Sequence, residues 1–312
     1  MRITESNQSM LEKLKTAWRL MVICWRVLML DKELLIFPIL SVVSLALSLG
    51  FVVWPVYLAG HLDTLIGWFS DDPEAANNLT MIVVTYLCYV FTTFVLVFFN
   101  TALIACARIR FAGGDPTVAD GLRAAASRLP LVFFWAVVTA TVGFILQKAS
   151  EKAGGLASII FGFLGGAWTI AAFFVVPVLV ADRVGPFKAL KTSASLIRKT
   201  WGEALVANVG FSAISVVAII PALVLITIGA MLFEGIPALA ITLIVFAVFV
   251  IATTALVVST LDAILTSALY VYAVDGKLPD HFDGADLEHA FGPHEPETTQ
   301  HVPDFDDHHG GN

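Results

Sequence analysis

The chain has 312 residues, of which 58% are hydrophobic and only 14% are charged. Soluble proteins carry roughly 25% charged residues, so this composition excludes an ordinary soluble domain and indicates a membrane protein. The formal net charge of −7 arises mostly at one end, because ten of the 25 acidic residues follow Val274, and the nearly neutral remainder excludes a nucleic-acid partner.

The N-terminal segment, residues 1–33, predicts an amphipathic helix ahead of the first apolar run. Apolar side chains recur there every three or four positions, at Leu11, Leu14, Trp18, Met21, Trp25 and Leu28. Lys15, Arg19 and Arg26 fall on the opposite face. Such a helix either packs on the protein itself or lies at the membrane surface with its tryptophans at headgroup depth. We expect the surface position, with the three basic residues contacting lipid headgroups.

Residues 34–275 predict a membrane domain of six spans. Each apolar run approaches or exceeds 20 residues, which is enough to cross a hydrocarbon core of about 30 Å. The runs lie at Leu34–Leu58, Leu79–Ala107, Leu129–Gln147, Leu156–Ala181, Ala204–Met231 and Pro237–Val258. The last helix is expected to continue to about Val274, beyond the bilayer.

Basic residues predict how the chain threads the membrane. Six of the 18 Lys and Arg residues precede the first span, four lie in the second loop, five in the fourth loop and one in the C-terminal tail. Only Lys148 and Lys152 lie in the intervening loops. Basic residues are enriched in cytoplasmic loops, so we expect both termini in the cytoplasm and the protein in a bacterial inner membrane.

A basic, amphipathic segment precedes each pair of spans, at Leu11–Leu28, Pro116–Leu129 and Pro186–Trp201. The third is the clearest, because Lys188, Lys191, Arg198 and Lys199 lie opposite a row of apolar side chains. These four residues are expected to contact anionic headgroups. The predicted fold is therefore all-α, with three repeated hairpins that are each preceded by an interfacial helix.

Residues 276–312 change character and predict a disordered cytoplasmic tail. The segment contains six of the seven histidines and many acids, with few aliphatic side chains. Its histidines lack the compact spacing of a metal site, so we expect no bound metal. The three cysteines fall in or beside apolar helices, where they are expected to act as small buried side chains.

Polar residues inside the apolar runs are the candidate site positions. They are Asp262, Asn100, Asp182, Asn208 and Glu203. Counted from Pro237, Asp262 lies about 37 Å along its helix, near the inner headgroups. These residues either anchor the surface helices by pairing with Arg108, Arg110, Arg183 or Arg198, or form a proton or ion site. We expect the pairing. Gly162 and Gly166 form a GxxxG pattern, which predicts close helix contact.

Catalytic patterns are missing from the apolar runs. The apolar runs contain no histidine for a serine–histidine pair and no HExxH zinc motif. The chain also has no phosphate-binding glycine loop. We therefore expect no enzymatic activity and no cofactor.

Three blocks of the sequence carry a family resemblance. They are WRVLMLDKELLIFPILS (Trp25–Ser41), ALKTSASLIRKTWGEALVANVG (Ala189–Gly210) and ALYVYAVDGKLPDHFDGADLEHAF (Ala268–Phe291). The chain resembles an uncharacterised family of bacterial and archaeal integral membrane proteins with six helices, and remotely the membrane domain of some glycerophosphodiester phosphodiesterases. The resemblance implies a cytoplasmic-membrane location and no particular activity.

Two functional classes remain open. One is a membrane organiser that binds anionic lipid or a protein partner through its basic surface helices. The other is a small transporter or channel with a polar path among the hairpins. Strong polar groups gather near the inner surface rather than at mid-depth, which favours the organiser. The sequence leaves open whether the chain forms a homo-oligomer.

Overall fold

The computed structural model describes residues 18–58, 79–153, 155–200, 219–276 and 279 of the chain. Within these ranges the protein is helical, without strands. Five helices are long and apolar enough to cross a membrane: Lys32–Gly50, Ile82–Phe111, Leu129–Ala153, Ala157–Asp182 and Pro237–Asp275. The all-α membrane fold is therefore confirmed at this level, and the chain is a multi-pass membrane protein.

The predicted fifth span, Ala204–Met231, begins outside the described residues. Its described part is a shorter apolar helix, Ile219–Leu232, which packs against the last long helix. The six spans and their arrangement as three repeated hairpins consequently stay a prediction. The external loop 59–78 and the tail from residue 280 also lie outside the described residues.

The helix bounds agree closely with the predicted runs. After a helix at 18–30, the elements are η1 (Lys32–Leu35), α2 (Ile36–Leu58), α5 (Leu79–Phe111), α6 (Val118–Ala126), α7 (Leu129–Ala153), α8 (Gly155–Ala172), α9 (Val175–Asp182), α10 (Pro186–Thr200) and α12 (Pro237–Asp275). The last of these continues to Asp275, as expected from the sequence.

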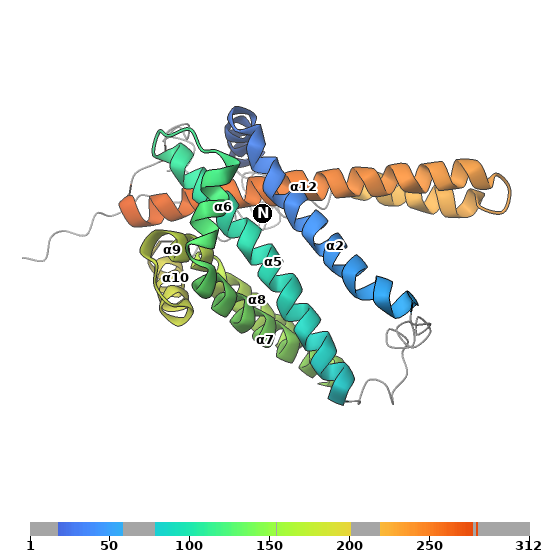
Figure 1. Ribbon diagram of the computed structural model, residues 1–312, viewed down its shortest axis with the longest axis horizontal. Coiled ribbons are helices and arrows are strands. Elements are labelled where there is room, and N and C mark those ends of the chain that lie inside the picture. Colours follow the sequence, from blue (N-terminus) through green and yellow to red (C-terminus); the bar gives the residue numbers. More distant parts are fainter. Residues whose placement is uncertain (1–17, 59–78, 154, 201–218, 277–278, 280–312) are drawn as a thin grey trace, which may run out of the picture.

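The helices pack tightly at one end and diverge at the other. Figure 1 shows α12 crossing α2 and α5, with α6, α9 and α10 gathered near its C-terminal part. The buried core is concentrated there, in residues 101–107 of α5, 175–180 of α9, and 260–261 and 263–270 of α12. Away from this packed end, large apolar side chains such as Leu47, Phe163 and Phe249 are exposed, where lipid would cover them.

A proline divides the fourth span into α8 and α9. The ring of Pro177 has no N–H and would clash with the carbonyl of Phe173, four residues earlier, so the helix breaks there. The freed backbone N–H of Phe174 donates to Ser193 Oγ of α10 at 3.0 Å, in a buried position. The break thus supplies the hydrogen bond that holds α10 against α9.

The apolar side of α10 faces its own protein. Leu190 and Ile197 pack against the core, and the helix contacts α8 and α9. The predicted apolar face is therefore only partly available to lipid, although Phe187 at its start is exposed. The expected close contact at Gly162 and Gly166 is not formed by the described part of the chain, since nothing lies within 4 Å of a Cβ built at either position.

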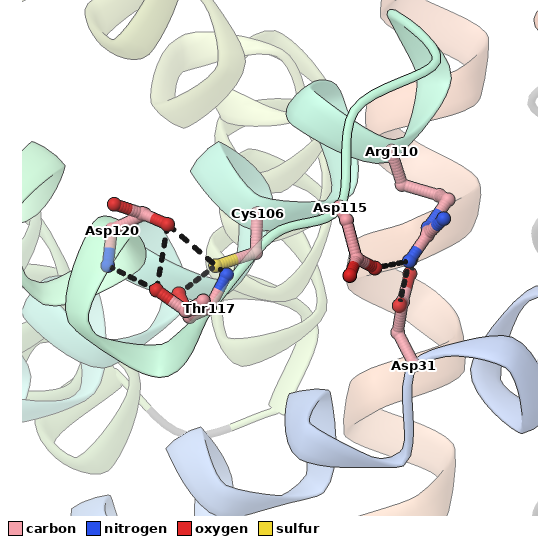
Figure 2. Close-up of polar contacts among 6 residues, drawn as sticks. All are labelled: Asp31, Cys106, Arg110, Asp115, Thr117 and Asp120. Carbon is pink, nitrogen blue, oxygen red and sulfur yellow. Dashed lines mark hydrogen bonds and ion pairs between the residues drawn. The ribbon is translucent and has the colours of Figure 1, made fainter.

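Arg110 joins the N-terminal helix to the end of α5. Its guanidinium donates two hydrogen bonds to Asp31, which is 6% exposed, and one to Asp115, which is 93% exposed. Figure 2 shows Arg110 between the two carboxylates, which come from different segments of the chain. The pair with Asp31 is largely shielded from water, so it is a structural contact rather than a surface one.

Close backbone packing joins α6 to α5 and α2. A Cβ at Gly121 would lie 2.6 Å from both Cys106 Sγ and Phe37 Cζ. The start of α6 is a capping box, in which Thr117 Oγ1 accepts from the Asp120 N–H at 3.3 Å and the Asp120 carboxylate accepts from the Thr117 N–H at 3.2 Å (Figure 2).

Candidate functional site: a polar cleft around Asn100 and Asp262

Asn100 and Asp262, two of the predicted site residues, line the same cleft. It has a volume of about 550 Å³ and lies between α2, α5 and α12, close to where α12 crosses the other two helices. Ser41 of α2 and Ser259 of α12 contribute further hydroxyl groups, and the remaining walls are mostly apolar. Four polar side chains from three helices therefore meet in an apolar setting.

The register of α5 against α12 explains this meeting. The Arg108 guanidinium lies 5.6 Å from the centre of the Tyr270 ring. Asn100 precedes Arg108 by eight residues, and Asp262 precedes Tyr270 by the same number. Both helices run towards the packed end (Figure 1), so Asn100 and Asp262 each lie about 12 Å before this contact along their own helix.

A second cavity adjoins Asn100 and Asp262. Its volume is about 560 Å³, and it is lined by residues of α5, α7, α8, α9 and α12. Trp135 and Trp168 form part of its wall, with stacked rings whose centroids are 5.8 Å apart. Thr139 and Thr266 add hydroxyl groups. Because both cavities are lined by Asn100 and Asp262, these two residues stand between them.

Several polar atoms around the two cavities have no hydrogen-bond partner. The Asp262 side chain is exposed on the wall of the cleft, and it forms neither a salt bridge nor a hydrogen bond with any residue in the described ranges. The buried oxygens of Ser41 and Thr139 are also unpartnered there. Buried polar groups in proteins are usually hydrogen-bonded, so unpartnered ones on a cavity wall mark a place where a ligand could bind.

The expected pairing of Asp262 with a surface arginine is not found in the described part of the protein. Arg110 pairs with Asp31 and Asp115 instead, and Arg108 lies over Tyr270. The sequence offered no clear signal for the contact between Asp31 and Arg110, because the two residues lie 79 positions apart. Ser41 was likewise missed, since serine is common in membrane helices.

A third hollow continues along the seam between α2 and α5. It measures about 700 Å³ and is lined mainly by apolar side chains from 45–49 of α2 and 87–92 of α5. The cleft at Asp262 begins about one helical turn further along the same two helices, at Leu96 and Val42. The seam therefore carries successive hollows, and the one at the packed end is polar.

The other predicted site residues lie elsewhere. Asp182 is exposed at the end of α9, while Glu203 and Asn208 fall outside the described residues. Among the predicted lipid contacts, the exposed ones are Lys188, Lys191 and Arg198 of α10 and Arg19 and Arg26 of the helix at 18–30. Lys15 and the side chain of Lys199 are not described.

No group of three or more His, Cys, Asp or Glu side chains could hold a metal within the described ranges.

A family described as a family of unknown function (DUF6159) matches residues 79–279. The chain belongs to this family. The DUF6159 match includes Asn100 and Asp262 but not α2, so Ser41 lies outside it. No curated protein matches the chain, and the remote likeness to glycerophosphodiester phosphodiesterases is not shown by the family match.

Proposed function

We propose that this protein binds a hydrophobic organic cation in the cleft at Asp262 and acts as a small transporter. The observation that carries the proposal is the Asp262 carboxylate, which has no partner among the described residues and lines two cavities with apolar and aromatic walls. This is the transport alternative from the sequence, now favoured over the organiser by where Asp262 and Asn100 lie.

The chemistry of the walls sets the class of ligand. A carboxylate inside a membrane span costs free energy unless a positive charge compensates it. Arg108 and Arg110 are engaged elsewhere, so a bound cation would supply that charge. Aromatic ring faces attract organic cations, and Trp135 and Trp168 line the cavity beside Asp262. Apolar walls further favour a cation with a hydrocarbon or aromatic body.

The successive hollows along the seam between α2 and α5 favour transport of the cation over binding alone. Its apolar hollow adjoins the diverging halves of the helices, and its polar cleft lies near the packed end. A hydrophobic cation could enter from the lipid and reach Asp262 along this seam. Asp262 and Asn100 would then hold it between the two cavities.

A flux assay tests the transport proposal. Proteoliposomes containing the full chain are expected to exchange labelled tetraphenylphosphonium faster than protein-free liposomes corrected for passive leak. Asp262→Asn should reduce the protein-dependent rate to background, whereas Asp275→Asn, which removes an exposed carboxylate from the end of the same helix, should leave it unchanged. Equal rates for wild type and Asp262→Asn would contradict the proposal.

A membrane organiser is the second candidate, and the exposed basic face of α10 favours it. Lys188, Lys191 and Arg198 are exposed while the opposite side packs on the protein. On this proposal the protein is not an enzyme, lies in a cytoplasmic membrane with both termini inside, and uses α10 to attract anionic headgroups. Protein-dependent clustering of anionic but not zwitterionic lipid, unaffected by Asp262→Asn, would support this candidate over transport.

Threading can be tested independently of either function. In a background without native cysteines, Asp71→Cys and Thr192→Cys should react with an impermeant maleimide from opposite sides of the membrane. Thr192 is partly accessible on α10, and Asp71 lies in the predicted external loop. Labelling of both from one side would contradict the expected orientation.

A further inference from the structure

Three arginines lie at the ends of three membrane spans, on the side of the packed core. Arg108 is near the end of α5, Arg128 immediately precedes α7, and Arg183 immediately follows α9. Figure 1 shows the corresponding ends of α5, α6 and α9 together near the C-terminal part of α12. By the predicted threading, this is the level of the cytoplasmic headgroups.

Arg128, which immediately precedes α7, joins α6 to α9. Its Nη1 donates to the Ala124 carbonyl of α6 at 2.9 Å, and its Nη2 donates to the Val180 carbonyl of α9 at 2.8 Å. Its buried Nε has no partner in the structure described. Arg183 follows Val180 by three residues, and its left-handed backbone (φ 51°) ends α9. Arg128 and Arg183 are thus held near one another by α9.

The positive charges are not neutralised by the described carboxylates. None of the three arginines forms a salt bridge within the described ranges, in contrast to Arg110. Burial lowers the pKa of Arg128, and the charges of Arg183 and Arg108 lower it further, so the three guanidinium groups act on one another. Asp182 lies next to Arg183 in the sequence, yet it forms no salt bridge with any of these arginines within the described ranges.

We propose that Arg108, Arg128 and Arg183 form a binding site for a phosphate group. Guanidinium groups donate paired hydrogen bonds to phosphate oxygens and lose less hydration than ammonium groups when they do so. A phosphate would accept from the exposed Arg183 and from the partly exposed Arg108, with Arg128 held beside them by its bonds to α6 and α9, and it would relieve the repulsion among the three charges. The phosphate comes either from an anionic lipid of the inner leaflet or from a soluble phosphate. This site is separate from the Asp262 cleft and does not depend on the proposed transport.

The test compares phosphate-bearing probes on the full-length protein. Arg128 also bonds to two backbone carbonyls, so the informative variants are Arg108→Gln and Arg183→Gln, singly and together. The matched control is the double variant Lys188→Gln and Lys191→Gln, which removes two exposed charges from α10. Native mass spectrometry from mixed micelles measures retained phosphatidylglycerol, and a parallel titration uses inorganic phosphate as competitor.

A hydrogen bond to a charged group contributes about 1.5–3 kcal/mol, which is at least about tenfold in affinity. Each single variant should therefore reduce retained phosphatidylglycerol at least about tenfold. The α10 control removes only the general attraction of two exposed charges, so its effect should be clearly smaller. Arg108→Lys together with Arg183→Lys keeps the charge and should bind weakly, because the paired donors are lost.

The competitor distinguishes the two phosphate sources. A lipid headgroup site is identified if the arginine variants retain less phosphatidylglycerol and millimolar inorganic phosphate does not displace this lipid from the wild-type protein. Displacement by millimolar inorganic phosphate identifies a soluble phosphate ligand. Two results would contradict the proposed site. In one, retained phosphatidylglycerol falls equally in the arginine variants and in the α10 control. In the other, it does not fall in well-folded arginine variants. Unfolding temperature in detergent establishes which variants are well folded.

Discussion

The packed end of the helices and their diverging halves are built differently, although the same helices form both. At the packed end, several polar groups are paired: Arg110 with Asp31, Thr117 with Asp120, and Ser193 with the backbone of Phe174. Arg108, Arg128 and Arg183, at the same end, form no salt bridge within the described ranges. In the diverging region, apolar side chains are exposed and hollows separate the helices. Asp262 and Ser41 lie near the crossing of α12 with α2 and α5, on the wall of the cleft, and have no described partner.

This difference distinguishes residues that hold the helices together from residues that could bind a ligand. Paired, buried polar groups fix the relative positions of helices and leave nothing for a ligand to bind. Cavities with a few unpaired polar groups among apolar walls are typical of ligand sites. We therefore expect substitutions of these paired groups to change stability, and substitutions on the cleft wall to change binding with little effect on stability.

The largest loss of stability is expected from Asp31→Ala. Removing one partner of a buried ion pair leaves an uncompensated charge, which costs about 3–5 kcal/mol, and the remaining contact of Arg110 with Asp115 should hold the loss near the lower figure. Asp115→Ala removes the exposed partner of the same arginine and should cost at most about 1 kcal/mol. Denaturant unfolding in detergent measures both, and equal losses would show that Asp31 is not the structural partner.

Gly121→Ala should produce the next largest effect. The added Cβ would meet Cys106 Sγ and Phe37 Cζ at 2.6 Å and the Ala102 carbonyl at 2.8 Å. Overpacking of this kind costs roughly 1–3 kcal/mol. Gly162→Ala is the control, because its Cβ would meet nothing within 4 Å and alanine favours helix. A comparison of unfolding temperatures in which Gly121→Ala matched or exceeded wild type would contradict the observed packing.

Thr117→Ala should have a smaller effect, with a distinctive pH dependence. Loss of the N-cap hydrogen bond costs about 1 kcal/mol. Hydrogen bonds from Thr117 lower the pKa of Asp120 below its usual 3.8, with a smaller contribution from Arg123. The ionised carboxylate therefore stabilises the fold at pH values above 3.8, and this stabilisation is lost as the pH falls through the lowered value. The difference in unfolding temperature between wild type and Thr117→Ala should be constant near neutral pH and shrink in acid.

The positions of the long helices could be predicted from sequence because hydropathy alone specifies a run that lipid can cover. α5 and α12 begin where expected, and α12 continues to Asp275. The break between α8 and α9 was not predicted, although Pro177 was a readable signal for it. The contact of Asp31 with Arg110 depends on how distant segments pack, which no local pattern specifies.

The candidate site could be predicted only in part. Asn100 and Asp262 stood out because polar groups are costly inside apolar runs, and the structure brings them together. Their depth suggested pairing with surface arginines, but Arg110 pairs with Asp31 and Asp115 instead, and Arg108 lies over Tyr270. The apolar face of α10 was predicted to face lipid, whereas Leu190 and Ile197 pack on the protein, because periodicity identifies a buried face without identifying what covers it.

Equilibrium binding of tetraphenylphosphonium to the purified full-length protein tests the central claim most directly. Wild type and Asp275→Asn should bind with the same affinity, and Asp262→Asn should bind at least about tenfold more weakly, because contacts to a charged group contribute about 1.5–3 kcal/mol. All three proteins should unfold at similar temperatures. Equal affinity of wild type and a well-folded Asp262→Asn protein would contradict the assignment of this carboxylate as the cation site.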